Sequence, residues 1–284
     1  MGDSLKAHLV RRAEREAVVE HLALDAPGNL LLLDLAARLG SAPAPGELRT
    51  EIAVARRGRG IAGVVGLRPS VVFDTGADEA AVEAFLPFLE TLGVGLVKSA
   101  AGLVDSLWQQ LERRAPRRTL VDRYETAYVL RREHAALLPR GRGSAARPGR
   151  SGDLESLTYA ARESLREEGR PDPFTGDVRS FRRWVAGRVP RARVVECEGQ
   201  VVFAGYADVQ RSEGWLLQGV YTWPEVRGRG FATGGVSDLC HEAFEAGAEH
   251  VQLAVVEGNA PGERLYERLG FERFTRLRTI LFSN

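Results

Sequence analysis

The second half of the chain alternates between helical and strand-like hydrophobic periods. Segment 231–247, FATGGVSDLCHEAFEAG, places Val236, Leu239, Cys240 and Phe244 on one helical face. Short β-branched and aromatic runs predict strands on either side of it. In chain order, we expect helices at 154–169 and 180–189, strands at 191–199, 200–210 and 214–222, the helix at 231–247, a strand at 250–257, a helix at 261–270 and a strand at 271–282.

The first half repeats much of this order. Two strands around a turn are expected in 49–69, and the apolar run 29–40 indicates a buried helix. Further along, the pattern predicts a strand at 71–76, a helix at 77–93, a strand at 94–99, a helix at 102–114 and a strand at 118–131. The similar order suggests a diverged internal duplication, although no strong sequence identity between the halves supports it. The expected fold class is α+β with mixed sheets.

A change of composition separates the halves. Segment 137–153, LLPRGRGSAARPGRSGD, is rich in Gly, Arg, Pro and Ser and has few large apolar residues. We therefore predict an N-terminal domain at 1–138, a linker at 139–152 and a C-terminal domain at 153–284. Ser151 or Asp153 is expected to cap the helix that follows.

Composition excludes several classes of protein. The chain has 284 residues, a formal net charge of +1, 44% hydrophobic and 27% charged residues. No overall basic field favours nucleic acid or an anionic membrane, and no apolar run is long enough to span a bilayer. Two cysteines, Cys197 and Cys240, offer neither a disulfide framework nor paired metal ligands. We expect a cytoplasmic protein without metal, nucleic-acid or membrane partners; the oligomeric state stays open, with a homodimer as one option.

The motif RGRG occurs three times, at 57–60, 140–143 and 227–230. A loop between a strand and a helix can bind a diphosphate, because backbone N–H groups and the helix N-terminus point at the anion. Glycine lets the backbone approach the oxygens closely. The first copy is interpreted as a hairpin turn and the second as part of the linker. Only the third copy stands between a strand and an amphipathic helix, so it is the candidate anion site.

The residues around this third copy resemble the signatures of the GNAT superfamily of acyl-CoA-dependent N-acyltransferases. In GVYTWPEVRGRGFATGGV, the family element Q/R-x-x-G-x-G/A falls on Arg227, Gly230 and Ala232. In VVEGNAPGERLYERLGF, the second signature falls on Asn259, Tyr266 and 269–271. The match is firm over 220–271 and faint over the first 140 residues. The chain resembles two-domain members of the family, with an N-terminal half that is a degenerate copy of the family's domain.

This resemblance implies a cofactor site for acetyl-CoA as co-substrate, with no metal. Two strands of the implied fold splay apart and admit the pantetheine arm. The arm would pair with the backbone of a strand end, and backbone amides of the loop would hold the pyrophosphate. The implied cofactor-binding residues are Val220, Tyr221, Thr222, Arg227, Gly228, Arg229, Gly230, Phe231, Ala232 and Asn259.

Acyl transfer by direct attack in a ternary complex sets three tasks. The acceptor ammonium must lose a proton, the oxyanion must be stabilised, and the thiolate must leave. Tyr266 is the candidate general acid; alternatively, its ring only packs beneath the cofactor. Asn259 would hold the pantetheine amides or cap a helix ahead of Pro261. A backbone N–H of the strand ending at Thr222 is the expected oxyanion donor.

The general base is left open by the sequence. Cys240 is interpreted as a core residue and His241 as a surface residue. The weighed candidates for the base, or for holding a water, are Glu196, Glu198, Glu213, Gln218 and Tyr221.

The N-terminal half departs from the family pattern where its anion site would lie. Asp74, Asp78 and Glu79 surround that expected helix start, where they suit the helix dipole and would repel a pyrophosphate. The chain is therefore predicted to be an N-acetyltransferase with a small-molecule or peptide amine acceptor and one working half. The alternative is a catalytically silent acyl-CoA sensor.

Overall fold

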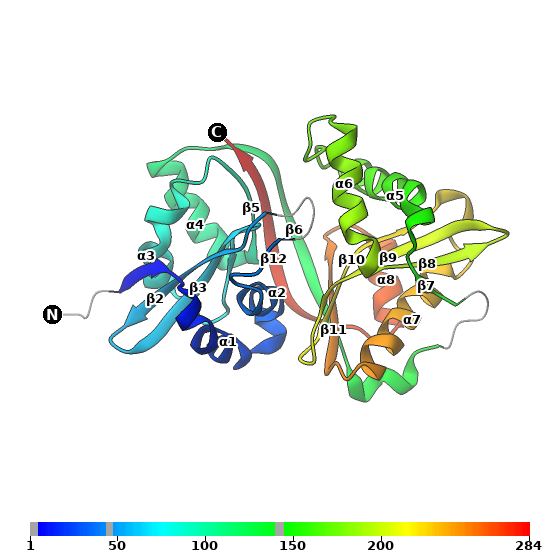
Figure 1. The fold of residues 1–284 in the computed structure, drawn as a ribbon, viewed down its shortest axis with the longest axis horizontal. Coiled ribbons are helices and arrows are strands. Elements are labelled where there is room, and N and C mark those ends of the chain that lie inside the picture. The colour runs from blue at the N-terminus through cyan, green and yellow to red at the C-terminus, as the bar shows by residue number, and fades with distance from the viewer. Residues whose placement is uncertain (1–4, 44–47, 140–144) are drawn as a thin grey trace. The chain divides into compact units, whose positions relative to one another are not determined.

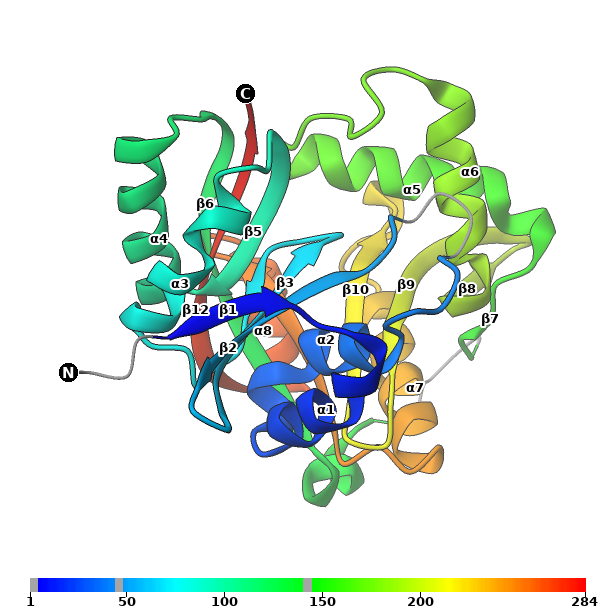
Figure 2. The same cartoon turned by 60° about the vertical axis from the view of Figure 1, so that its left-hand side comes forward.

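The computed structural model describes residues 5–43, 48–139 and 145–284. Internal contacts divide these into two compact units. The first unit contains residues 5–43, 48–126 and 275–284, and the second contains residues 127–139 and 145–274. Figures 1 and 2 show the elements of both units.

The first unit begins with strand β1 (Lys6–Leu9) and the helices α1 (Arg15–Ala23) and α2 (Ala26–Ala37). Strands β2 (Glu51–Arg57), β3 (Gly60–Arg68) and β4 (Val72–Phe73) follow, and they form an antiparallel sheet in the order β1-β2-β3-β4. Helix α3 (Glu79–Leu89), strand β5 (Val94–Ala100), helix α4 (Ala101–Arg114) and strand β6 (Arg118–Arg131) complete the run. The sequence missed β1 and α1 but predicted the others.

Side-chain alternation along β2 explains the layers of the first unit. Ile52 and Val54 pack with α1 and α2, whereas Ala53 and Ala55 pack with α3 and α4. The sheet is therefore buried on both faces, as a strand with consecutive apolar residues requires.

The second unit repeats the order helix–helix–three strands–helix–strand–helix. After strand β7 (Arg147–Pro148) come the helices α5 (Leu154–Glu167) and α6 (Val178–Arg188). Strands β8 (Ala192–Cys197), β9 (Gln200–Gln210) and β10 (Trp215–Thr222) lead to helix α7 (Phe231–Glu245), strand β11 (His250–Val256) and helix α8 (Ala260–Arg268). The strands lie in the order β11-β10-β9-β8-β7. These elements confirm the predicted mixed α+β fold.

Alternation along β9 again separates two hydrophobic layers. Ala204 and Tyr206 pack with α5 and α6, while Phe203 and Ala207 pack with α7 and α8. Figure 1 shows α5 and α6 on one side of these strands and α7 on the other. The ends of β9 and β10 thus lie between two helical layers.

The predicted domain boundary differs from the division that the contacts make. The sequence assigned residues 139–152 to a linker and 153–284 to one domain, but the units divide within β6 and within strand β12 (Glu272–Ser283). The end of β12 pairs antiparallel with β5 from Leu277–Ala100 to Ser283–Val94. Ile280 and Phe282 are buried in the core of the first unit, and this burial explains why the chain end belongs there.

A buried ion pair also ties this strand to the first unit. Glu125 is 3% exposed, and its carboxylate lies 2.5 Å from Lys98 Nζ and accepts a hydrogen bond of 2.8 Å from the Thr279 hydroxyl. Burial alone would raise the pKa of Glu125, but the Lys98 ammonium outweighs it and lowers the pKa to about 2. The charged carboxylate is therefore the stable form at neutral pH.

The expected helix cap at Asp153 is formed differently. Asp153 occupies the N-cap position of α5, yet its carboxylate makes no cap bond there. It accepts hydrogen bonds from Arg147 at 2.8 Å and from the Arg150 backbone N–H at 2.7 Å. A single 3₁₀ turn, Ser151–Asp153, precedes the helix instead.

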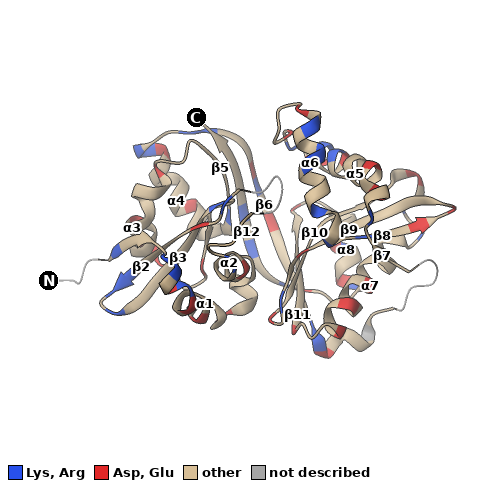
Figure 3. Cartoon of the chain, viewed as in Figure 1, with Lys and Arg blue, Asp and Glu red and all other residues tan. Residues whose placement is uncertain are grey.

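Charges are mixed over both units. Basic and acidic segments are interspersed along the described chain (Figure 3). None of its helices is both long and apolar enough to cross a membrane. The described residues also contain no group of three or more His, Cys, Asp or Glu side chains that could hold a metal ion.

Candidate functional site

Strand β10 is interrupted by a bulge. Gln218 pairs with Tyr206 and Tyr221 pairs with Ala204, so Gly219 and Val220 together face the single residue between those partners on β9. Gly219 has φ +57°, a left-handed conformation that glycine adopts without strain. Because a bulge takes its extra residue out of the ladder, backbone groups in this short stretch become available to a ligand.

Strands β10 and β11 diverge beyond their first residues. Both lie wholly within the described chain, and their parallel pairing is confined to Trp215–Val251 and Leu216–Gln252. The edge of β10 that runs through Val220, Tyr221 and Thr222 is therefore not paired with β11. This is the splayed geometry expected for a ligand arm that adds to β10 as a strand.

The third RGRG copy follows directly. A 3₁₀ turn, Pro224–Val226, leads into the loop, and α7 begins with Gly230 as N-cap at φ +89°. Gly228 also has positive φ, +75°. No side chain caps α7, so the N–H groups of its first turn are left for a ligand to accept from.

Arg227 is held by its neighbours rather than directed freely into the loop. Its Nε donates to the Thr222 carbonyl oxygen at 2.9 Å, and its terminal nitrogen lies 2.8 Å from a carboxylate oxygen of Glu167 on α5. The side chain thus braces the end of β10. Arg229 is exposed, with its guanidinium 5.5 Å from the centre of the Phe231 ring, and within the described chain it forms no ion pair.

Asn259 has the capping position that the sequence offered as one alternative. Its Oδ1 accepts a hydrogen bond of 3.1 Å from the Gly262 N–H, with Pro261 in the first turn of α8. This cap does not use the Nδ2 group, which remains able to donate. Binding of the pantetheine amides by Asn259 therefore stays a prediction.

Tyr266 lies on α8 inside the hydrophobic layer shared with α7. Its side chain is 8% exposed, and its ring centre lies 5.7 Å from that of Phe271 and 6.3 Å from that of Tyr128. Val220 and Phe231 pack against the same hydrophobic cluster to which Tyr266 belongs. Burial raises the pKa of its phenol, so the group is protonated at neutral pH.

The structure does not single out a general base among the weighed carboxylates. Glu196 lies 2.6 Å from Arg147, whose hydrogen bond lowers the pKa of the carboxyl. Glu213 lies in the β9–β10 turn. Burial alone would raise the pKa of its carboxyl, but the interaction with Arg211 outweighs this effect and lowers the pKa. Glu198 forms the β8–β9 turn at φ +52°.

The uncharged alternatives are also placed. Burial raises the pKa of Tyr221 to about 12, so this phenol is not a base at neutral pH. Gln218 is half-buried beside the bulge, where it can still hold a water. Cys240 is fully buried in the core, as predicted, and burial raises the pKa of its thiol. His241 is half-buried rather than a surface residue.

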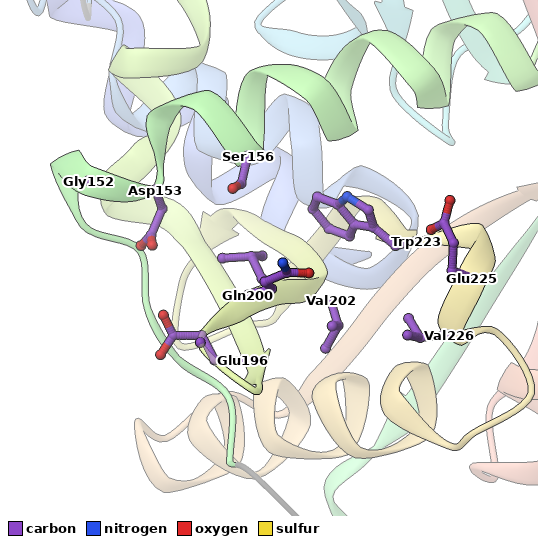
Figure 4. Close-up of a pocket in the computed structure, with 11 residues that line it drawn as sticks. Gly152, Asp153, Ser156, Glu196, Gln200, Val202, Trp223, Glu225 and Val226 are labelled. Atoms are coloured by element: carbon purple, nitrogen blue, oxygen red, sulfur yellow. The ribbon is translucent and has the colours of Figure 1, made fainter.

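A pocket that the sequence did not indicate adjoins the loop. It has a volume of about 570 Å³ and lies between the start of α5, the β8–β9 hairpin and the turn before Arg227. Figure 4 shows Ser156, Gln200, Trp223 and Glu225 around it. Residues from three separate segments meet here, so the sequence gives no local pattern from which the pocket could be predicted.

The corresponding helix start of the first unit is closed. Asp78 caps α3 by accepting a hydrogen bond of 2.8 Å from the Ala81 N–H. Asp74 is 1% exposed, accepts from the Val64 N–H at 3.0 Å and lies 3.0 Å from His21 Nε2. Asp78 therefore takes an N–H donor of the α3 start, and Asp74 adds a buried carboxyl group to the segment before it.

Comparison with known proteins agrees with this geometry. Residues 158–271 match the model of the Acetyltransferase (GNAT) family. A search of curated proteins finds no match to the chain.

Solved structures resemble the chain over nearly its whole length. A Drosophila protein is 17% identical with a TM-score of 0.69, covering 99% of both chains. A GCN5-related N-acetyltransferase from Sphaerobacter thermophilus is 16% identical with a TM-score of 0.59, covering 99% of this chain and 96% of its own. A tandem GNAT protein from the clavulanic acid biosynthesis pathway is 14% identical with a TM-score of 0.60, covering 98% of both. At these identities the likeness concerns the fold.

Proposed function

We propose that the protein transfers an acetyl group from acetyl-CoA to an amine acceptor, because residues 158–271 match the model of the Acetyltransferase (GNAT) family. The acceptor is a small molecule or a peptide. The transfer is proposed to be direct, with both substrates bound together. Cys240, which belongs to the same core cluster as Tyr266, is fully buried and burial raises the pKa of its thiol, so it is a poor nucleophile.

The observation that carries this proposal is the junction of β10 and α7. An uncapped helix start with two glycines at positive φ follows a strand edge that has lost its parallel partner. A diphosphate fits the first feature and an extended amide-bearing arm fits the second. Coenzyme A contains both groups in this order, so one molecule satisfies the whole junction.

The chemical steps can be assigned to this framework. The thioester carbonyl would lie at the bulge, where a backbone N–H at Gly219 or Val220 stabilises the oxyanion. Tyr266, protonated because its pKa is raised, would donate to the departing thiolate. The acceptor amine loses its proton to water or to a group that the acceptor itself brings near.

The first unit is proposed to bind no acetyl-CoA. At its corresponding helix start Asp78 accepts a hydrogen bond from the Ala81 N–H, and the carboxylate of Asp78 would repel a diphosphate. One molecule of acetyl-CoA per chain is expected.

Titration calorimetry with acetyl-CoA, followed by thiol release with a panel of amines, tests the proposal. We expect a stoichiometry of one and turnover with at least one class among amino acids, polyamines, aminoglycosides and lysine peptides. Binding without turnover across the panel would favour the silent sensor. Absence of binding would refute the proposed cofactor.

A further inference from the structure

The bulge in β10 needs support from its surroundings, because it lacks some of the interstrand hydrogen bonds that keep a strand straight. On one side, β11 has diverged and gives no pairing at this level. Support must therefore come from side chains on the faces of the sheet. The face covered by α5 and α6 provides it.

Tyr206 lies directly against the bulge. A Cβ atom placed on Gly219 would lie 3.0 Å and 3.3 Å from two carbons of the Tyr206 ring, so the ring fills the space beside the glycine. Tyr206 is 2% exposed, and its neighbours in the core include Val185 of α6. A ring packed so closely limits the conformations that the Gly219 backbone can adopt.

Arg188, the last residue of α6, packs against both that ring and the glycine. Its guanidinium carbon lies 4.1 Å from the centre of the Tyr206 ring and 4.9 Å from that of Trp184. One terminal nitrogen lies 2.5 Å from the Asp208 carboxylate on β9 and 3.9 Å from the Cβ position of Gly219.

Burial makes this arrangement rigid. The side chains of Arg188 and Asp208 are 12% and 13% exposed, so solvent screens their attraction weakly. A cation over an aromatic face is attracted more strongly when both groups are desolvated. The planar guanidinium can pair with the carboxylate and lie over the aromatic ring at the same time, which an ammonium could not.

We infer that Arg188 and Tyr206 are positioning residues that hold the β10 bulge in the conformation that presents its N–H groups to the thioester carbonyl. Asp208 orients Arg188, Arg188 presses on the Tyr206 ring, and the ring fixes Gly219. This inference rests on the proposed acetyl transfer. It adds that α6 sets the geometry of the oxyanion site through a cation–aromatic clamp.

The test uses the carbonyl band of bound [1-¹³C]acetyl-CoA, measured by isotope-edited infrared spectroscopy, together with kcat and the acetyl-CoA Kd. In the parent protein the band should lie at lower wavenumber than in free acetyl-CoA, because hydrogen bonds polarise the carbonyl. Arg188→Met and Tyr206→Leu should return the band toward the free value and lower kcat by roughly 10²-fold, with little change in Kd, since removing one oxyanion donor has an effect of this order.

Two controls separate positioning from general damage. Tyr206→Phe keeps the ring and should behave as the parent, because the hydroxyl has no hydrogen-bond partner among the described residues. Arg211→Met breaks a comparable ion pair with Glu213 at the far end of the β9–β10 hairpin and should leave the band and kcat unchanged. Thermal melting confirms that each variant is folded. If Tyr206→Leu does not fold, Arg188→Met alone provides the test.

The outcomes are distinguishable. A parental band and parental kcat in folded Arg188→Met would overturn the clamp while leaving acetyl transfer intact. Binding by the parent without any shift of the band would likewise overturn it, since the bulge would then not polarise the carbonyl. Failure of the parent to bind acetyl-CoA would overturn both the proposed function and this inference.

Discussion

Phe282, two residues from the end of the chain, should stabilise the first unit rather than the second. Its side chain is 2% exposed, its ring centre lies 5.6 Å from that of Trp108 on α4, and it covers Gly95 on β5. Replacing it with Ala removes a buried ring from a core that cannot fully collapse around the cavity. The expected loss is about 3–5 kcal/mol of unfolding free energy.

That loss is a large part of the ~5–15 kcal/mol that stabilises an ordinary domain. For a unit of this size it corresponds to a fall in melting temperature of roughly 10–20 °C. Trp108 is the one tryptophan of the first unit; the other three, Trp184, Trp215 and Trp223, lie in the second. Fluorine NMR of protein labelled with fluorotryptophan therefore follows the two units separately during thermal unfolding.

The matched control is Phe274→Ala. Phe274 lies on the same strand, but it is 37% exposed and belongs to the second unit. Replacing Phe274 should lower the free energy of unfolding far less. It should also leave unchanged the temperature at which the Trp108 signal reports unfolding. If Phe282→Ala leaves the Trp108 signal unchanged, or shifts the tryptophans of the second unit instead, the assignment of the chain end to the first unit is wrong.

Three further predictions concern the loop, the acid and pH. Gly230→Val should weaken acetyl-CoA binding at least about 10-fold in calorimetry, because the N-cap has φ +89°, whereas Gly60→Val in the β2–β3 turn should leave the affinity unchanged. Tyr266→Phe should lower kcat by roughly 10²-fold with acetyl-CoA affinity retained; unchanged kcat would leave the ring a packing role. Glu125 has a pKa lowered from 4.5 to about 2, so its contribution of about 3 kcal/mol is present above pH 4.5 and lost as pH falls toward 2. Denaturant unfolding of Glu125→Gln should show a flatter acid limb over that window, and an identical limb would contradict it.

Most helices and strands were predictable because their hydrophobic periods are local. Strand β1 and helix α1 were missed because the charged N-terminal segment shows only two buried positions on α1, Val18 and Leu22. The predicted domain boundary and the division between the units rest on different signals. Composition correctly marks 139–152 as polar, but which sheet a strand joins depends on its partner, and β5 lies far from β12 in the sequence. No window of residues around 275 contains that information.

The candidate site likewise has one part that the sequence predicts and another part that it does not. Loop, cap and strand end were predictable, since Val220–Thr222, Arg227–Ala232 and Asn259 each follow from neighbouring residues. The supports of the site were not. Tyr206 meets Gly219 only because two strands pair in a shifted register, and Arg188 at the end of α6 reaches Asp208 on β9 although β8 lies between them in the sequence. Side chains that act by packing carry no spacing signature, so their role becomes visible only when distances are known.

The three RGRG copies show how far a motif depends on its surroundings. At 57–60 the residues close the β2–β3 hairpin, where Arg57 pairs with Gly60 and Gly58 has φ +60°. The backbone groups at this turn therefore pair within the hairpin. The copy at 140–143 lies outside the described residues. At 227–230 a helix begins whose first N–H groups have no side-chain cap, beside a strand edge without its partner. Identical residues thus offer free N–H donors to an anion only where the flanking elements leave those donors without partners.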